Sequence, residues 1–291
     1  MEFLRKKGSA LLALAALTGM CLIRLTAYGA FNLSAANADT ATYIQGGAPP
    51  VLSADMLTRS RLLTTNLLYY FANTQNCEPT VISYPAIQTE TYRGVQPCFE
   101  GIAVLQNAVS VFAWAALALV VSKRLQGGYE KILAVLLISG FGYTPAIADW
   151  DSILGSESLT FSLFALSLGL VIETGFRVAE DMEGKRFPTL LAAAGLAVLA
   201  LWAFTRDANI YPLAVLSAVS AIAAAAIPAL RKNRKLLGFI AALFAIVIVG
   251  LQSAMLSRRW EVPLANVYND LILPHPARVE FMEELGMPAP H

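Results

Sequence analysis

Two apolar runs without a single charge, residues 132–148 and 159–172, flank a short acidic segment. With its edges, each run approaches the ~20 residues that a helix needs to cross a bilayer. The segment between them holds the carboxylates Asp149, Asp151 and Glu157. The pattern predicts a short hairpin tip between two membrane spans. Acids held against a bilayer are costly and tend to be functional; the alternative is that a short loop at the water interface simply needs polar residues.

The whole chain has the composition of an integral membrane protein. It is 57% hydrophobic and only 14% charged, whereas a soluble domain carries about 25% charged residues. The net charge of +1 suggests no nucleic-acid partner, and two histidines without a CxxC pair make a zinc site improbable. We therefore predict an all-α, polytopic membrane protein in contact with the lipid bilayer.

Hydrophobic runs divide the chain into seven predicted spans and two polar parts. The first span also fits a cleaved signal peptide, since three basic residues precede it, but its length favours a retained span. A long loop, residues 30–101, follows it, with an amphipathic interfacial helix predicted at 54–72 and loop structure at 73–99. The predicted spans cover residues 8–25, 102–122, 131–148, 158–175, 189–205, 209–230 and 236–256. Residues 1–256 form the membrane module, and 257–291 form a polar tail with a short helix near 277–285.

Basic residues mark one side of the membrane. Lys and Arg cluster before the first span and in every second loop after it, while the acidic tip has none and the 205–209 turn has only Arg206. Cytoplasmic loops carry the excess of positive charge. This alternation predicts a multi-pass protein of a bacterial-type inner (plasma) membrane, with the N-terminus cytoplasmic and the C-terminus extracytoplasmic. Residues 30–101, the acidic tip and the tail then share the outer face.

Two cysteines fall within the predicted outer loop. Cys77 and Cys98 lie where disulfides persist, so we expect a bridge between them, with Cα atoms within about 7 Å. Two free thiols are the alternative. Cys21 lies inside the first span as a small core residue.

Several polar residues are predicted to meet on the outer face. Asp39 opens the loop, in a segment that includes Tyr43, and Arg206 lies in its own short turn. Arg24 is near the outer end of the first span, where it either reaches the interface or faces an anionic lipid headgroup. Carboxylates act as general bases or hold a divalent cation, and arginines clamp phosphate oxygens. The alternatives are structural roles, in which Asp39 caps a helix and Arg206 pairs with Asp207.

This layout resembles the GT-C superfamily of membrane glycosyltransferases, which includes the protein O-mannosyltransferases and the aminoarabinose lipid A transferase. Their shared module has a first span, a long outer loop that opens with an acid, and a second acidic loop. Asp39 falls at the first position, the three tip carboxylates fall at the second, and residues 99–106 entering the second span are similar in character. The chain departs from this family in two ways. Asp39 stands alone where the mannosyltransferases have an Asp-Glu pair. The chain has about seven spans, whereas most active members carry further spans or a soluble outer domain.

The resemblance implies a polyprenyl-phosphate sugar donor, an acceptor on the outer face and a divalent cation such as Mg²⁺ or Mn²⁺. We expect Asp39 and at least one of Asp149, Asp151 and Glu157 to line a single cavity at the outer membrane boundary. Asp149 and Asp151 are the stronger candidates of the three. Glu157 ranks lower because the start of a helix already accounts for an acid. The candidate catalytic residues are Asp39, Asp151 and Asp149, and the candidate substrate-binding residues are Arg206, Arg24, Glu157 and Tyr43.

Two other functions compete with a glycosyltransferase. One is a non-catalytic membrane subunit that serves assembly or scaffolding with a partner subunit in the membrane. The other is a transporter, which typically places ionisable residues in the middle of spans. The charges of the predicted second to seventh spans cluster at their ends, which argues against a transporter.

Overall fold

The fold was obtained as a computed structural model of the 291-residue chain. The residues that it describes are 2–27, 31–37, 39–47, 53, 55–56, 61–72, 77, 82–84, 89–91, 94–180, 188–231, 233–258 and 261–286.

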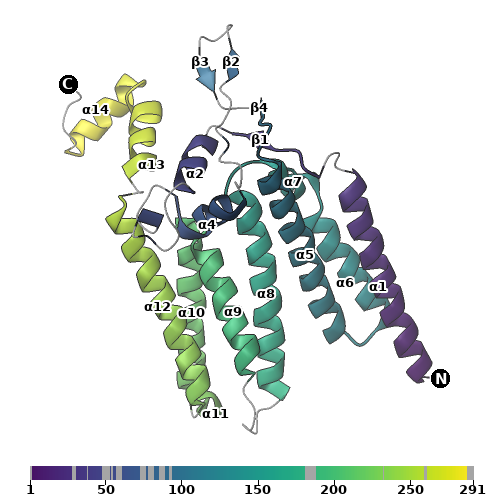
Figure 1. The fold of residues 1–291 in the computed structure, drawn as a ribbon. Helices are drawn as coiled ribbons and strands as arrows, with labels where there is room; N and C mark the ends of the chain where they lie inside the picture. The colour runs from purple at the N-terminus through teal and green to yellow at the C-terminus, as the bar shows by residue number, and fades with distance from the viewer. Residues whose placement is uncertain are drawn as a thin grey trace.

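Long helices lie side by side and make up most of the molecule, as Figure 1 shows. This confirms the predicted all-α, polytopic membrane fold. Five helical segments are long and apolar enough to cross a bilayer among the described residues. The helices that provide them are α1 (Glu2–Ala27), α5 (Glu100–Arg124), α8 (Glu157–Glu180), α10 (Ile210–Ala226) and α12 (Arg234–Leu256).

The other two predicted spans are less regular. Helix α6 (Gly128–Gly142) is followed by α7 (Pro145–Ala148) and a 3-10 turn at Asp149–Ser152, and this pair of segments is bent by 49°. Proline causes the break, because Pro145 has no N–H to donate and excludes the preceding residue from helical backbone. Helix α9 (Thr189–Ala203) has 15 residues, which gives about 22 Å at 1.5 Å per residue, short of the ~30 Å hydrocarbon core.

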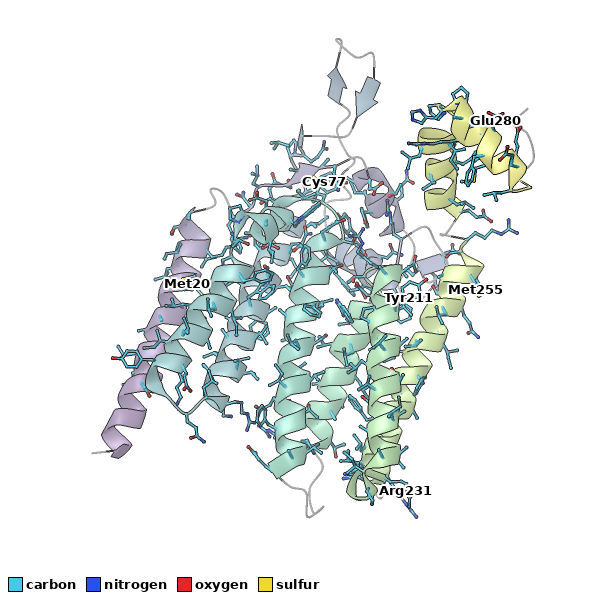
Figure 2. The ribbon with its side chains drawn as sticks, turned by 180° about the vertical axis from the view of Figure 1, so that it is seen from behind. Met20, Cys77, Tyr211, Arg231, Met255 and Glu280 are labelled. Atoms are coloured by element: carbon cyan, nitrogen blue, oxygen red, sulfur yellow. A yellow bond between two sulfur atoms is a disulfide. The ribbon has the colours of Figure 1, made fainter. Side chains whose placement is uncertain are left out.

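The two sets of loops lie at opposite ends of the bundle. The N-terminus and the short helix α11 (Pro228–Arg231) lie at one end, and the long loop and the C-terminal tail lie at the other (Figure 1). We call the second the loop end, which comprises the described residues within 31–99, 145–156, 204–209 and 257–286. Figure 2 shows Cys77 at the loop end and Arg231 at the opposite end. The arrangement matches the predicted grouping of loops, whereas the direction in which the chain crosses the membrane stays a prediction.

The long loop is more structured than we predicted. It contains helices α2 (Thr40–Gly46) and α4 (Leu63–Ala72) and the antiparallel strand pairs β1–β4 and β2–β3. The prediction of one helix over 54–72 was wrong in its extent, because Arg61 and Leu62 precede α4 in non-helical backbone. The prediction of plain loop at 73–99 was also wrong. The strands are β1 (Ala35–Ala36), β2 (Ile82–Tyr84), β3 (Thr89–Thr91) and β4 (Gly94–Val95).

Helix α4 is docked on the protein through its polar face as well as its apolar one. Thr64 donates its backbone N–H to the carbonyl of Phe204 at 3.1 Å and its hydroxyl to the carbonyl of Leu201 at 2.6 Å. These carbonyls belong to the end of α9, where a helix leaves its last carbonyl groups without helical partners. Helix α4 therefore caps α9 at the loop end, which explains why Thr64, Thr65 and Asn66 are buried.

The cysteine prediction is confirmed. Cys77 and Cys98 form a disulfide with their Cα atoms 6.0 Å apart, and it ties the long loop to the start of α5. A bridge that closes a loop of this length is worth roughly 3 kcal/mol in the chain-entropy model.

The tail leaves α12 at the loop end (Figure 1). It consists of α13 (Glu261–Asn266), a π-helical turn at Val267–Ile272 and α14 (Pro276–Glu284). Helix α14 confirms the short helix predicted near 277–285, and α13 was not predicted.

Candidate functional site

The start of the long loop is docked onto the acidic segment. Leu154 donates its N–H to the carbonyl of Ala35 at 2.8 Å, and the Thr40 hydroxyl donates to the carbonyl of Leu154 at 2.8 Å. The Tyr43 hydroxyl is hydrogen-bonded to the Ser156 hydroxyl at 2.9 Å. These bonds bring the two segments that the sequence singled out, the one at Asp39 and the one after Asp149, together at the loop end.

Asp39 is exposed and paired with an arginine that sequence reasoning did not select. Its Oδ1 lies 3.1 Å from Nη2 of Arg61, and the side chains are 63% and 23% exposed respectively. Asp39 occupies the N-cap position of α2, as the alternative reading expected, but its side chain makes no capping hydrogen bond. Arg61 was visible in the sequence only as one of a few basic residues in a long loop.

Arg61 also covers Tyr43. Its Nε donates to the Thr42 hydroxyl at 2.7 Å, its Nη1 donates to the Tyr43 hydroxyl at 3.3 Å, and its Cζ lies 4.1 Å from the centre of the Tyr43 ring. This is cation–π geometry. The Asn66 amide in turn donates to the Arg61 carbonyl at 2.8 Å, which fixes the backbone from which the guanidinium extends.

Tyr43 stacks on a second buried tyrosine. The ring centroids of Tyr43 and Tyr69 are 6.0 Å apart, with 24° between the planes. Burial raises the pKa of both phenols above the ordinary value, so both remain protonated at neutral pH. The Tyr69 hydroxyl is buried without a hydrogen-bond partner among the described residues, although buried polar atoms are nearly always paired.

Glu157 and Arg206 form the second ion pair of this cluster. Nη1 of Arg206 lies 3.1 Å from Oε1 of Glu157, so Arg206 faces the acidic segment as predicted. Glu157 begins α8, and its Oε2 accepts the N–H of Ser156 at 3.0 Å. A Cβ at Gly155 would come within 2.6 Å of that Oε2, so the absence of a side chain there makes room for the carboxylate.

Arg24 and Asp151 form a third pair, which is buried. The side chains are 3% and 1% exposed, with Nη2 of Arg24 2.8 Å from Oδ2 of Asp151. The same Nη2 donates to Asn107 Oδ1 at 2.7 Å and to the Ala148 carbonyl at 3.3 Å, and the Ser158 hydroxyl donates to Asp151 Oδ1 at 2.6 Å. Both predictions for Arg24, snorkelling to the interface and facing a lipid headgroup, were wrong, because a carboxylate inside the protein holds it.

The burial of Asp151 changes its role among the predicted catalytic acids. Both of its oxygens accept hydrogen bonds inside the protein, and its pair joins α1 to the acidic segment. Asp149, on the same 3-10 turn, is exposed. The predicted site is thus divided into a buried pair and an exposed cluster. We call the second group, whose Asp39 and Arg206 side chains reach the surface, the outer cluster: Asp39, Tyr43, Arg61, Glu157 and Arg206. A cavity shared by Asp39 and the acidic segment stays a prediction.

The described residues do not gather the ligands of a metal ion. No three His, Cys, Asp or Glu side chains within them are placed to hold one. The carboxylates of Asp39, Asp151 and Glu157 each face an arginine instead. Paired in this way, these three carboxylates do not fit a divalent cation.

A further ion network lies at the opposite end of the bundle. Glu173 of α8 accepts hydrogen bonds from Arg124 of α5, with Nε at 3.1 Å, and from Arg177, with Nε at 2.8 Å. Glu173 is 9% exposed, so the network fixes α5 against α8 where the chain leaves the apolar layer. Sequence reasoning missed this residue because a single acid near the end of a span carries no distinctive signal.

Comparison with known protein families, with curated proteins and with solved structures found no match to this chain. The function must therefore be inferred from the site itself.

Proposed function

We propose that this protein is a membrane transferase that moves a sugar from a polyprenyl-phosphate donor to an acceptor at the extracytoplasmic face. The observation that carries the proposal is the docking of residues 35–43 onto residues 153–156. It gathers an exposed carboxylate and two partly exposed guanidinium groups at the end of an apolar bundle. A donor with a lipid tail and a charged head would meet both surfaces at this boundary.

Asp39 is the proposed general base, because it is the most exposed carboxylate among the pairs Arg61–Asp39, Arg206–Glu157 and Arg24–Asp151. It would take the proton from an acceptor hydroxyl while that oxygen forms a bond to the anomeric carbon of the sugar. The bond from that carbon to the phosphate oxygen breaks in the same step, and the lipid phosphate leaves with the electron pair. Arg206, 48% exposed, would stabilise the charge on the departing phosphate through its planar fork.

The test is lipid-linked sugar analysis of cells that carry wild-type protein or Asp39→Asn, with Glu280→Gln, an exposed acid of the tail helix α14, as the control. Asp39→Asn preserves the shape of the side chain and removes only the basic oxygen. We expect the lipid-linked donor to accumulate in the Asp39→Asn cells while the amount of membrane-inserted protein is unchanged. Normal donor turnover in these cells would remove the base, and loss of the protein would make Asp39 a structural residue.

A specific observation favours a non-catalytic role as the second candidate. Asp39, Asp151 and Glu157 each face an arginine from a different element, an arrangement that holds elements together without chemistry. Under this reading the loop end is a rigid platform for a membrane partner subunit. Unchanged lipid-linked sugars in cells that lack the gene would favour it.

A further inference from the structure

We propose that Arg61 is a latch on the outer cluster, which a phosphate-bearing ligand opens by taking the guanidinium away from Asp39 and Tyr43. The inference rests on the proposed function for the identity of the cluster, and it adds the regulation of that site.

Arg61 is the group that closes this cluster. A single guanidinium contacts the carboxylate of Asp39, the hydroxyls of Thr42 and Tyr43, and the face of the Tyr43 ring. While it is in place, the acid that would act as a base has a cation against one oxygen, and the Tyr43 ring is 5% exposed. The closed arrangement is therefore a resting state in which the base is paired with a cation and the tyrosine ring is covered.

Exposure decides which ion pair at the loop end is able to open. Ion pairs in contact with water are weak and screened by salt, whereas a buried pair leaves an uncompensated charge when it is broken. The Arg61–Asp39 pair is the one with a carboxylate 63% exposed, and the Arg24–Asp151 pair is almost fully buried. An anion in solution or at the membrane surface thus competes for Arg61 and not for Arg24. Guanidinium groups bind phosphate oxygens through two parallel hydrogen bonds.

Movement of Arg61 would also allow a ligand to form a hydrogen bond with the Tyr69 hydroxyl. The Tyr69 hydroxyl is buried and has no partner among the residues described, and its ring stacks on the ring that Arg61 covers. A ligand that carries hydroxyl groups beside its phosphate would offer this phenol a hydrogen bond once the guanidinium has moved. The ligand class that fits is a phosphorylated, hydroxyl-bearing molecule.

The experiment measures how fast N-acetylimidazole acetylates the Tyr43 hydroxyl in the purified full-length protein, located by peptide mass spectrometry. Tyr129, 92% exposed, serves as the internal reference. We expect Arg61→Gln to accelerate acetylation of Tyr43 by about tenfold, which corresponds to about 1.4 kcal/mol of lost contacts. Arg278→Gln is the control, since it removes an exposed guanidinium of the tail that donates to the Leu271 carbonyl, and it should leave the rate unchanged. If Arg61→Gln does not fold, Asp39→Asn, which removes the charge of the pair, must raise the rate instead.

The second part of the experiment measures the effect of phosphate on the acetylation of Tyr43. Inorganic phosphate should accelerate acetylation of Tyr43 in the wild type beyond chloride at equal ionic strength, and it should have no such effect in Arg61→Gln. Acceleration only in phosphatidylcholine vesicles that contain phosphatidic acid would assign the phosphate to a lipid headgroup. Equal rates in wild type and Arg61→Gln, or equal effects of phosphate and chloride with no response to the lipid, would overturn the latch. Because no sugar transfer is measured, failure of the transferase proposal leaves this result intact.

Discussion

Replacing Arg24 by methionine is the sharpest test of how the loop end is held together. Methionine keeps an unbranched apolar stem and removes the cation, so the Asp151 carboxylate, 1% exposed, keeps only the hydrogen bonds that other residues donate. Breaking a buried ion pair by removing one partner costs about 3–5 kcal/mol. The lost donor also leaves Asn107 Oδ1 and the Ala148 carbonyl without the bonds at 2.7 and 3.3 Å, each worth roughly 1 kcal/mol. We expect a loss of about 5–7 kcal/mol in the free energy of unfolding.

The assay is reversible unfolding in mixed micelles by a denaturing detergent, monitored by circular dichroism. Two further variants make it decisive. Arg24→Met combined with Asp151→Asn removes both charges and should recover more than half of the loss, because no unpaired ion remains buried. Arg206→Met breaks an ion pair whose arginine is 48% exposed and should cost less than about 1 kcal/mol. A loss below about 1 kcal/mol for Arg24→Met, or a double variant as unstable as the single one, would refute the reasoning.

Three other predictions follow from the packing, the outer cluster and the charge pattern. Gly142→Ala should destabilise the protein by about 1–3 kcal/mol, because a Cβ there would lie 2.2 Å from the Trp114 ring. The same detergent titration measures this loss. Gly175→Ala is the control, because a Cβ at Gly175 would meet nothing within 4 Å. Arg206→Lys keeps the charge but loses the fork, so donor turnover in vesicles should fall about tenfold or more, and equal turnover would leave Arg206 as a structural partner of Glu157. A reporter that is active only in the cytoplasm should be silent when fused to the C-terminus, and an active fusion would reverse the predicted orientation.

The packing of the first helix bears on whether it is retained. Ala13 and Leu17 of α1 are buried against Ala118 and Val135, and Arg24 supplies the cation of the buried pair. Removal of this helix as a signal peptide would expose that apolar surface and leave Asp151 buried without Arg24. The geometry therefore favours a retained span over the cleaved signal peptide.

The sequence by itself determined the membrane fold and the approximate positions of the long apolar helices. Uncharged apolar runs have no stable place except a bilayer or a core, and their length fixes how many can span. The charge pattern grouped the loops correctly into two ends, and the position of Cys77 and Cys98 in one loop was enough to predict their bridge. These are local properties of composition and length, which is why they are readable without a structure.

The tertiary structure alone decided which residues face one another. Arg24 and Asp151 are 127 positions apart, and an arginine near a span end looks the same whether it reaches for lipid or for a buried carboxylate. Nothing in the sequence around Arg61 indicated its role, which is visible only in the structure, where the residue lies over the Tyr43 ring. The partner of a charged group depends on how helices from distant parts of the chain pack, because electrostatic pairing acts through space over a few ångströms. Sequence patterns record the spacing along the chain, and at the loop end the spacing across the bundle is what makes the site.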